Sequence, residues 1–304
     1  MYNEMRKQQY VEEKRTYATL SNNIIATFYA VEQREMSLGR DLCEWSSNEI
    51  IDYYKWLSTP NIQTLVQLNS AIAEYTNWCI SNGLVSDNQN HYTEITTQML
   101  CECIDLNRFK RFILTREKII EDIKDIPNAQ DKFIILGLFE GITLKNQNLP
   151  NVKISDFEGN IVHLAKGTDL QVSYELVQIA KSAAEELEYI TLSSKNVSRS
   201  TPYEPGHETI LKPLMSKRGI IRNPSIIIGT RLRRIVSYLG WEEGITIKTV
   251  SESGRLEFIR TYAKRHNIKP EDFAVMAKYK PIHEQYYGTI QNGITYMKTY
   301  GAFL

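Results

Sequence analysis

The first 83 residues contain three stretches in which apolar or aromatic residues recur at every third or fourth position. These stretches are residues 16–35, 46–58 and 61–83. Such spacing places the apolar side chains along one face and predicts three amphipathic helices. Ser46 or Ser47 is expected to cap the second helix. Short amphipathic helices bury their apolar faces against one another, so this region is expected to form a small helical bundle.

A polar stretch without periodicity follows, and we expect an inter-domain linker over residues 91–107. This divides the chain into an N-terminal helical domain (1–90) and a second domain (108–304). The second domain carries further helical patterns and two β-rich runs around Glu158-Gly159-Asn160, which predict a hairpin. Its helices are expected at 115–123, 131–141, 174–187, 225–240, 256–266 and 270–277, with a loop over 201–224. The predicted fold class is mainly α with a small β-sheet.

Charge is unevenly distributed along the chain. The 304 residues include 36 Lys/Arg and 36 Asp/Glu, for a net charge of zero. Residues 1–104 hold 7 basic and 13 acidic residues, whereas residues 195–280 hold 17 basic and 8 acidic ones. A basic cluster of this kind suits a surface that follows a phosphate backbone. A solvated basic face without a ligand remains the alternative.

The cysteines and the apolar runs exclude several classes of protein. Four cysteines are too sparse for a disulfide framework, and we expect reduced thiols and no metal site. The N-terminus has no secretory apolar stretch, and the apolar run 133–139 is too short to cross a bilayer. We therefore expect an intracellular protein without a membrane partner or a cofactor. The cysteines are Cys43, Cys79, Cys101 and Cys103.

The most specific motif lies near the C-terminus, where Arg255 is followed by Lys278 after twenty-three residues and by Tyr287 nine residues later. This register resembles the C-terminal half of the tyrosine recombinases, the phage-integrase type of strand-exchange enzyme. Lys166-Gly167 resembles the hairpin that carries the catalytic lysine of that family, and residues 64–72 resemble its third N-terminal helix. The resemblance implies an N-terminal core-binding domain and a catalytic-type domain that clamp a DNA duplex.

Three positions depart from the chemistry of that family. Thr143 stands where the first arginine belongs, Glu252 where the first histidine belongs, and Lys278 where the second histidine belongs. An arginine on a phosphoryl transition state contributes roughly 10³ to 10⁵ in rate, and one oxyanion donor roughly 10² to 10³. We therefore expect no catalytic residues, only vestigial positions, which are Thr143, Lys166, Glu252, Arg255, Lys278 and Tyr287.

The chain also resembles the recombinase-derived master lysogeny repressors of SPβ-type temperate phages. That resemblance implies sequence-specific binding to operator DNA, repression of lytic genes and a location in the host bacterial cytoplasm. Self-association through the C-terminal tail, or binding by an anti-repressor protein, is expected to provide regulation. The expected DNA contacts are Thr64, Gln67, Lys166, Lys217, Arg218, Arg222, Arg231, Arg233, Arg234, Arg255 and Lys278.

Two other hypotheses remain open at this point. The chain could be a divergent but active recombinase or nicking enzyme that uses Tyr287 with Lys166, Arg255 and Lys278. It could also be a protein-interaction scaffold without a DNA ligand. A covalent phosphotyrosyl product would support the first hypothesis, and a lack of salt-dependent retention on DNA would support the second.

Overall fold

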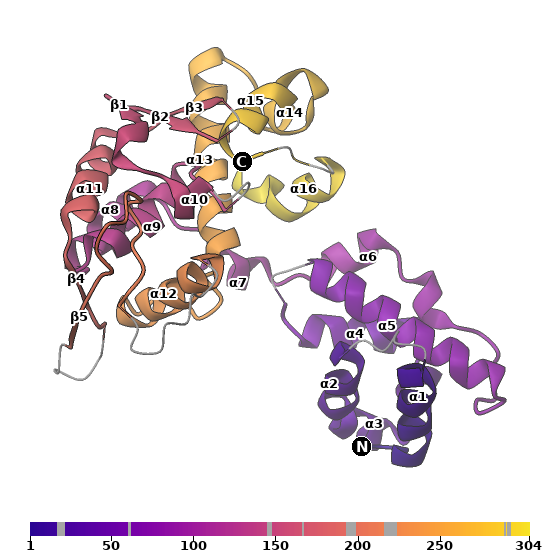
Figure 1. Ribbon diagram of the computed structural model, residues 1–304. Helices are drawn as coiled ribbons and strands as arrows, with labels where there is room; N and C mark the ends of the chain where they lie inside the picture. Colours follow the sequence, from indigo (N-terminus) through magenta and orange to yellow (C-terminus); the bar gives the residue numbers. More distant parts are fainter. Residues whose placement is uncertain are drawn as a thin grey trace. The chain divides into compact units, whose positions relative to one another are not determined.

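The chain folds into two compact units, Met1–Lys110 and Arg111–Leu304. The computed structural model describes residues 1–16, 22–59, 62–144, 148–165, 167–192, 199–215, 224–288, 290 and 293–304 (Figure 1). Within these ranges, no helix is both long enough and apolar enough to cross a bilayer.

The first unit is entirely helical in the residues that the structure describes. Of the expected helix over 16–35, residues 17–21 lie outside the described residues, and residues 22–35 fall in two helices that meet at Val31. Ser46 caps the next helix through a capping box with Glu49. An additional N-terminal helix was not expected, because it is strongly polar. The elements are α1 (Glu4–Thr16), α2 (Asn22–Ala30), α3 (Glu32–Leu38), η1 (Leu42–Glu44), α4 (Ser47–Trp56), α5 (Ile62–Ser81), η2 (His91–Glu94), α6 (Thr97–Glu102) and α7 (Leu106–Lys110).

Aromatic side chains dominate the core of the first unit. Tyr10 of α1 packs edge-on against Phe28 of α2 and against Tyr75 and Trp78 of α5, with ring centroids 5.1 to 6.2 Å apart. Edge-to-face pairs of this kind add to the stabilisation from burial alone. They account for the attachment of α1 to the bundle despite its polar sequence.

The segment that we expected to be a linker is part of the first unit. Tyr92 is buried, and its hydroxyl donates to the Leu42 carbonyl at 2.8 Å, while Asn69 Nδ2 donates to the Tyr92 carbonyl at 3.0 Å. Other apolar residues of the segment complete the same core, namely Ile95, Leu100, Cys103 and Ile104. These side chains leave water only by packing on the bundle, so the boundary falls at Lys110.

The second unit contains helices and two small sheets. Its first elements are α8 (Arg116–Asp122), η3 (Ile123–Asp125), α9 (Ala129–Phe139), α10 (Asn148–Asn151), η5 (Ile154–Asp156), β1 (Phe157–Glu158), β2 (Ile161–Leu164), β3 (Thr168–Gln171) and α11 (Tyr174–Glu185). They are followed by β4 (Glu188–Ile190), β5 (Ser200–Pro202), α12 (Pro224–Tyr238), α13 (Ile247–His266), α14 (Pro270–Val275), η6 (Ala277–Tyr279), α15 (Lys280–Tyr286), α16 (Gly293–Tyr300) and η7 (Gly301–Phe303).

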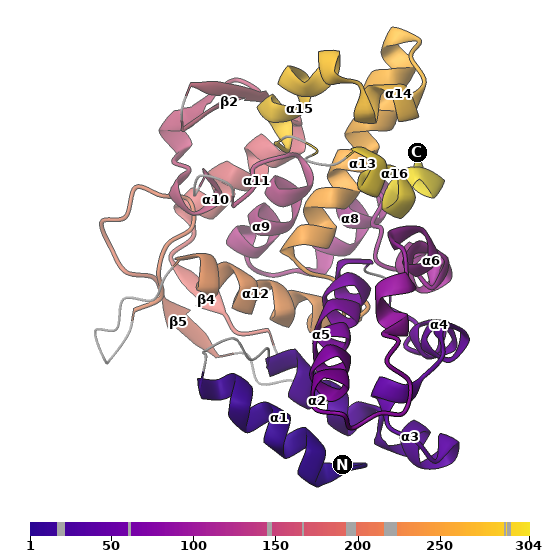
Figure 2. The ribbon, with the colours of Figure 1, turned by 90° about the vertical axis from the view of Figure 1, so that its right-hand side faces the viewer.

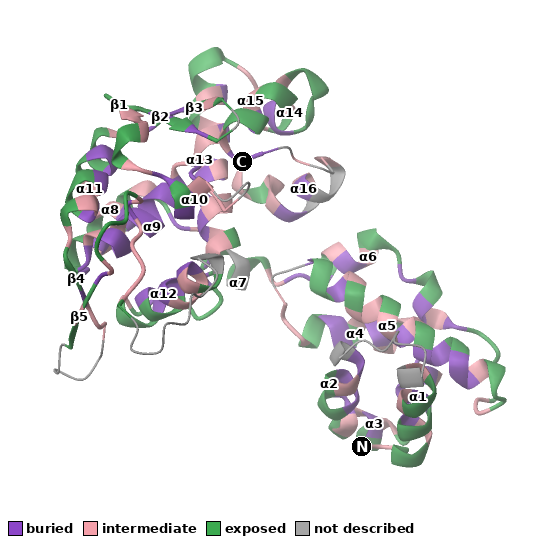
Figure 3. Ribbon diagram, in the orientation of Figure 1, coloured by how far each residue is buried: buried purple, intermediate pink, exposed green. Residues whose placement is uncertain are grey.

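Helix α9 is the centre of this unit. It packs against α11, α12 and α13 (Figure 2), and its side chains from Phe133 to Phe139 are buried (Figure 3). This explains why the sequence of α9 is apolar on all sides. The C-terminal end of α9 is therefore held rigidly at the point where α13 and α15 meet it.

The sheets are antiparallel and small. The predicted hairpin joins β1 to β2 through Gly159, whose φ of 60° suits glycine, and β3 adds a third strand with Val162 opposite Leu170. Strand β3 was not expected from the sequence, nor was the β4–β5 pair, whose second strand begins the segment that we expected to be a loop. The Gln285 amide of α15 donates to the Asp169 carbonyl of β3 at 2.7 Å, which ties α15 to the sheet.

The C-terminal tail folds back on its own unit. Tyr296 of α16 is buried against a cluster that includes Leu256 and Phe273, and Arg260 Nε donates to the Phe303 carbonyl at 2.9 Å. The tail through which we expected self-association thus packs against its own unit in this structure.

Candidate functional site

Tyr287 directly follows α15, and its hydroxyl caps another helix. The hydroxyl donates to the carbonyl oxygen of Phe139, the last residue of α9. Carbonyls in the last turn of a helix have no partner within the helix, so the phenol satisfies one of them. Burial raises the pKa of Tyr287, and the charge of Glu140 raises it further. The phenol is thus held in its protonated form.

Arg255 lies on α13 and reaches the end of α15. Its Nη2 donates to the carbonyls of Tyr287 at 2.6 Å and Gly288 at 3.4 Å, and its guanidinium carbon lies 5.8 Å from the centre of the Tyr287 ring. A cation at the C-terminal end of a helix also interacts favourably with the helix dipole. Arg255 therefore acts as a cap for α15 in this structure.

Glu252 lies one turn before Arg255 on α13 and neutralises it. Its Oε1 is 3.1 Å from Arg255 Nη1, and the two side chains are only 14% and 11% exposed. Burial raises the pKa of Glu252, while the charges of Arg255 and Lys248 lower it. Among the described residues, Glu252 Oε2 and Arg255 Nε have no hydrogen-bond partner. The pair is therefore buried but incompletely satisfied.

Gly254 allows these groups to come together. A Cβ at this position would overlap the Phe139 carbonyl oxygen and lie 2.8 Å from the Tyr287 hydroxyl oxygen. We call Phe139, Glu252, Gly254, Arg255 and Tyr287 the Tyr287 cluster. Sequence reasoning missed Phe139 and Gly254. A glycine inside a helical pattern costs about 1 kcal/mol relative to alanine and often indicates close packing, and this signal was available.

Thr143 is partly buried just beyond the C-terminal end of α9. It follows Gly141, whose φ of 101° requires glycine and whose Cα packs against the carbonyl of Tyr286. The arginine brought to this end of α9 is Arg116, with Nη1 2.7 Å from Glu140 Oε1 and Nη2 3.4 Å from Glu175 Oε2. Two carboxylates thus pair with Arg116 and offset its charge.

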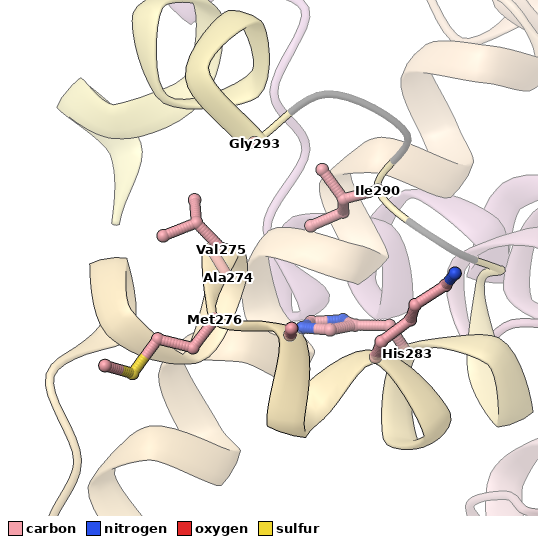
Figure 4. Close-up of a pocket in the computed structure, with 8 residues that line it drawn as sticks. Ala274, Val275, Met276, His283, Ile290 and Gly293 are labelled. Carbon is pink, nitrogen blue, oxygen red and sulfur yellow. The ribbon is translucent and has the colours of Figure 1, made fainter.

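Lys278 and His283 lie on the other side of the cluster. Lys278 is exposed on η6, and its ammonium lies 4.7 Å from the centre of the Tyr279 ring. His283 is buried, and its Nε2 lies 2.9 Å from the Phe273 carbonyl, so Nε2 carries the proton. The ring lines a pocket of about 450 Å³ between α14, α15 and the start of α16, together with Val275, Met276 and Ile290 (Figure 4).

The residues expected to contact DNA lie in different environments. Thr64 and Gln67 are exposed and share one face of α5, and Arg233 and Arg234 are exposed on α12. Arg231 is 6% exposed. Its Nε donates to Asp131 at 2.6 Å and its Nη1 to Gln130 at 3.1 Å, so it is a core residue. The remaining expected contacts, Lys166, Lys217, Arg218 and Arg222, lie outside the described residues.

Two family models match the chain in order. The MrpR N-terminal core-binding domain matches residues 1–81, and the MrpR C-terminal catalytic domain matches residues 113–300. The chain belongs to the MrpR family. The expected recombinase-type fold, with a helical core-binding domain and a mainly helical catalytic-type domain, is thereby confirmed.

Comparisons with curated proteins and with solved structures were also made for this MrpR-family chain. No curated protein matches it. A lambda integrase dimer bound to a COC′ core site is 11% identical, with 97% of this chain and 94% of that chain covered and a TM-score of 0.43. The XerA recombinase is 13% identical, with 94% and 90% covered and a TM-score of 0.39. These are similarities of fold alone.

Proposed function

We propose that this protein is a sequence-specific DNA-binding repressor that maintains the lysogeny of a temperate phage in the cytoplasm of its bacterial host. On this proposal it is a pseudoenzyme, derived from a tyrosine recombinase that has lost strand cleavage. The observation that carries the proposal is the Tyr287 cluster, in which Arg255 is paired with Glu252 and the Tyr287 hydroxyl caps α9.

Strand cleavage requires the opposite arrangement of charge. A phenolate oxygen must attack phosphorus, and cations must hold the negative charge that gathers on the non-bridging oxygens. Here a buried carboxylate lies 3.1 Å from the arginine that would meet those oxygens. The carboxylate repels a phosphate group, and burial keeps the phenol protonated. Threonine at position 143 removes a second cation.

Binding to DNA does not require the Tyr287 cluster. Arg233, Arg234 and Lys278 are exposed cations that suit phosphate contacts, which fix the position of a protein on the duplex. Thr64 and Gln67 are exposed neutral donors and acceptors on one face of α5, a chemistry that reads base edges. The lambda integrase neighbours are bound to core-site DNA, and we extend DNA binding from them to this chain as part of the proposal.

A trapping experiment tests the loss of cleavage. Genomic footprinting in the bacterial host first identifies a DNA site that the protein occupies. The protein is then incubated with a duplex that carries this site (the footprinted duplex) and a nick beside each candidate phosphate. An active tyrosine nucleophile would leave a covalent adduct that survives denaturation and disappears in Tyr287→Phe. We expect no adduct with the wild-type protein. An adduct that depends on Tyr287 would establish the alternative function, an active recombinase.

A salt titration tests DNA binding. The logarithm of the affinity for the footprinted duplex is expected to fall linearly with the logarithm of salt concentration, and Arg233→Ala with Arg234→Ala should reduce the slope of this line by about two. The matched control is Lys118→Ala with Lys124→Ala, which removes two exposed lysines paired with Asp122 and Glu121. An equal reduction of the salt slope in both double variants would contradict phosphate contacts by Arg233 and Arg234. Affinity that does not depend on salt would contradict them as well.

Regulation of the repressor is part of the same proposal. An anti-repressor protein, or self-association through the tail, would release the operator. Sedimentation of the free and DNA-bound protein distinguishes the two, because self-association changes the mass of the protein without any other component.

A further inference from the structure

His163 faces a carboxylate with each of its two ring nitrogens. It lies on β2, the central strand of the three-stranded sheet, between Glu158 of β1 and Asp169 of β3. Its Nδ1 is 2.8 Å from Asp169 Oδ1, and its Nε2 is 3.3 Å from Glu158 Oε2. A single ring therefore bridges the two outer strands of the sheet. We call these three residues the sheet triad.

Strand pairing places the sheet triad on one face of the sheet. Asp169 is directly opposite His163 in the β2–β3 pair, and Glu158 is opposite Ile161, two residues before His163. Side chains alternate between the two faces of a strand, so residues 161 and 163 point to the same face, and directly paired residues share a face. Val162 points to the other face and is buried in the core. The sheet triad consequently lies on the solvent side.

The geometry of the sheet triad favours a ring that carries two protons. An ionised carboxylate only accepts hydrogen bonds, whereas a neutral imidazole has one N–H donor and one acceptor nitrogen. A neutral ring can therefore donate to one of the two carboxylates and presents a lone pair to the other. Only the imidazolium ion satisfies both contacts. The hydrogen bonds to Asp169 and Glu158 accordingly raise the pKa of His163.

The surroundings of the ring add no competing positive charge from the neighbouring elements. β1, β3 and η5 pack against β2, and the charged residues of these three elements are Glu158, Asp169 and Asp156. Asp156 and His163 line the same pocket of about 270 Å³, and Asp156 Oδ2 accepts from the Lys153 amide at 2.8 Å. Every charged residue of these elements is acidic, which favours a positive charge on the ring.

The two outer strands differ in what holds them besides His163. The Asp169 carbonyl of β3 accepts from Gln285 Nε2 of α15 at 2.7 Å, and α15 lies beside β3 (Figure 1). β1 contains only Phe157 and Glu158 and lies at the edge of the sheet. A two-residue edge strand has few ladder hydrogen bonds, so β1 depends more than β3 does on contacts between side chains.

We propose that the sheet triad is a pH-sensitive switch, in which the protonated His163 ring fastens β1 to the sheet and loss of one proton loosens β1 and adds negative charge to this face. The neutral ring keeps the shorter contact, to Asp169, and presents a lone pair to Glu158. Because the folded-state pKa of His163 is raised, its contribution is complete below the ordinary pKa of histidine and is lost as pH rises through the raised pKa. All three side chains are exposed, so the effect on the fold is local.

An NMR titration of His163 in the full-length protein tests the protonation. The midpoint, the pH at which half of the rings carry two protons, is expected to lie above that of an ordinary histidine, about 6.5. Asp169→Asn should lower the midpoint more than Glu158→Gln does, because the contact with Asp169 is the shorter one. An ordinary midpoint that neither substitution moves would overturn the proposal.

Amide hydrogen exchange of β1 and β2 tests the loosening. Comparison of the wild type with His163→Gln at each pH cancels the intrinsic pH dependence of exchange. Protection should be greater in the wild type below the midpoint of His163 and equal in the two proteins above it. The matched control is His207→Gln, which removes an exposed histidine whose Nε2 lies 3.3 Å from a single carboxylate, that of Glu204. Equal protection in the wild type and His163→Gln at low pH would overturn the switch.

The effect of the added negative charge on DNA rests on the proposed function and is measured separately. β2 and β3 flank residues 165–167 in sequence, which include the expected DNA contact Lys166. As pH rises through the midpoint of His163, affinity for the footprinted duplex should fall a few-fold more in the wild type than in His163→Gln. Other titrating groups, Glu252 among them, are present in both proteins and cancel from the comparison.

The DNA measurement separates two kinds of failure. Curves of affinity against pH that stay parallel for the wild type and His163→Gln would overturn the link between the switch and DNA. Failure of both proteins to bind DNA would contradict the proposed function, and the titration and exchange results would still decide the switch.

Discussion

Arg231 and Arg255 of the second unit have side chains that are only 7% and 11% exposed, and they are paired in different ways. Arg231 of α12 binds Asp131 of α9, a residue 100 positions away in sequence, at 2.6 Å. Arg255 of α13 binds Glu252 of the same helix, three positions before it, at 3.1 Å. The first pair joins two elements of the core. The second pair lies within α13, and Arg255 reaches the end of α15 only through the backbone carbonyls of Tyr287 and Gly288. The two ion pairs therefore serve different ends.

The further hydrogen bonds of the two sites go to different neighbours. Asp131 also accepts from Asn128 Nδ2 at 2.9 Å, and Arg231 also reaches Gln130, whereas Arg255 Nη2 donates to the carbonyls of Tyr287 and Gly288. Each site leaves two buried polar atoms without a hydrogen-bond partner among the described residues, namely Arg231 Nη2 and Gln130 Nε2 at the first and Glu252 Oε2 and Arg255 Nε at the second. A buried polar atom without a partner costs about 1 to 3 kcal/mol. Both sites therefore keep their charges at some cost, and the difference between them lies in the elements that each ion pair joins.

Loss of Arg231 is expected to have the largest effect. Arg231→Met leaves Asp131 charged and buried, and removal of one partner from a buried pair costs about 3 to 5 kcal/mol. Denaturant unfolding measures this loss. Arg233→Met, two residues along on the exposed face, should change stability by less than about 0.5 kcal/mol. Equal effects of the two substitutions would show that Arg231 is not part of the core.

Gly254→Ala is expected to have the next largest effect. The new methyl group overlaps the Phe139 carbonyl, so α13 must move away from α9 at a cost of about 1 to 3 kcal/mol or more. Gly229→Ala on α12 is the matched control, because its Cβ would meet only Ile247 Cδ1 at 3.8 Å. That substitution should stabilise the protein by up to about 1 kcal/mol, since alanine is the better helix former. A stable Gly254→Ala would disprove the close approach of α13 and α9.

Patterns local in sequence predicted much of this molecule. The helices α4, α5, α9, α11 and α12 and the β1–β2 hairpin follow from periodicity and turn residues. The Glu252–Arg255 pair was not predicted, because the expected helix began at residue 256 whereas α13 begins at Ile247. Helix α1 was missed because its sequence is polar and its attachment depends on Tyr10, which meets aromatic rings of α2 and α5.

The features that the sequence did not predict depend on contacts between residues that are distant in sequence. Arg231 belongs to a basic run that suggested a surface, and only the fold brings Asp131 to it. Residues 91–104 read as a linker because their polar residues obscure the apolar ones that complete the first core. The spacing of Arg255, Lys278 and Tyr287 was recognised in the sequence. The role of the Tyr287 hydroxyl could not be predicted, because it depends on where α9 ends. Sequence thus singled out Glu252, Arg255 and Tyr287 but not Phe139 or Gly254, and the fold determined which of their groups are already occupied.

Tyr287→Phe separates a capping role from a catalytic one. The substitution removes the donor to the Phe139 carbonyl and is expected to cost about 1 kcal/mol of stability. Affinity for the footprinted duplex should stay within twofold of wild type, because the hydroxyl faces the core. Fluorescence anisotropy and denaturant unfolding measure the two quantities. A large loss of affinity with unchanged stability would place the hydroxyl at the DNA.

Glu252→Gln is expected to have the smallest effect and to act on DNA binding. The amide keeps the shape of the side chain and removes the charge that neutralises Arg255, so affinity should rise a few-fold and the salt slope should steepen by up to about one. The control is Glu257→Gln on the same helix, whose carboxylate lies 3.8 Å from Arg260. Glu257→Gln should leave the salt slope unchanged. An equal rise in affinity in both variants would show that the change in net charge alone is responsible.

The pH dependence of affinity follows from the same carboxyl group, which faces Arg255, Lys248, Tyr296 and Tyr300. Burial raises the pKa of Glu252, so it takes up a proton at a higher pH than an ordinary glutamate does. Its contribution to stability is therefore present below the ordinary pKa and is lost as pH rises through the raised one. As pH falls through that window, protonation frees Arg255, and wild-type affinity should rise toward that of Glu252→Gln. Curves of affinity against pH that stay parallel for the wild type and Glu252→Gln would mean that Glu252 does not control the charge of Arg255. The contrast between the Arg255 and Arg231 sites would then rest on the geometry of the two ion pairs alone.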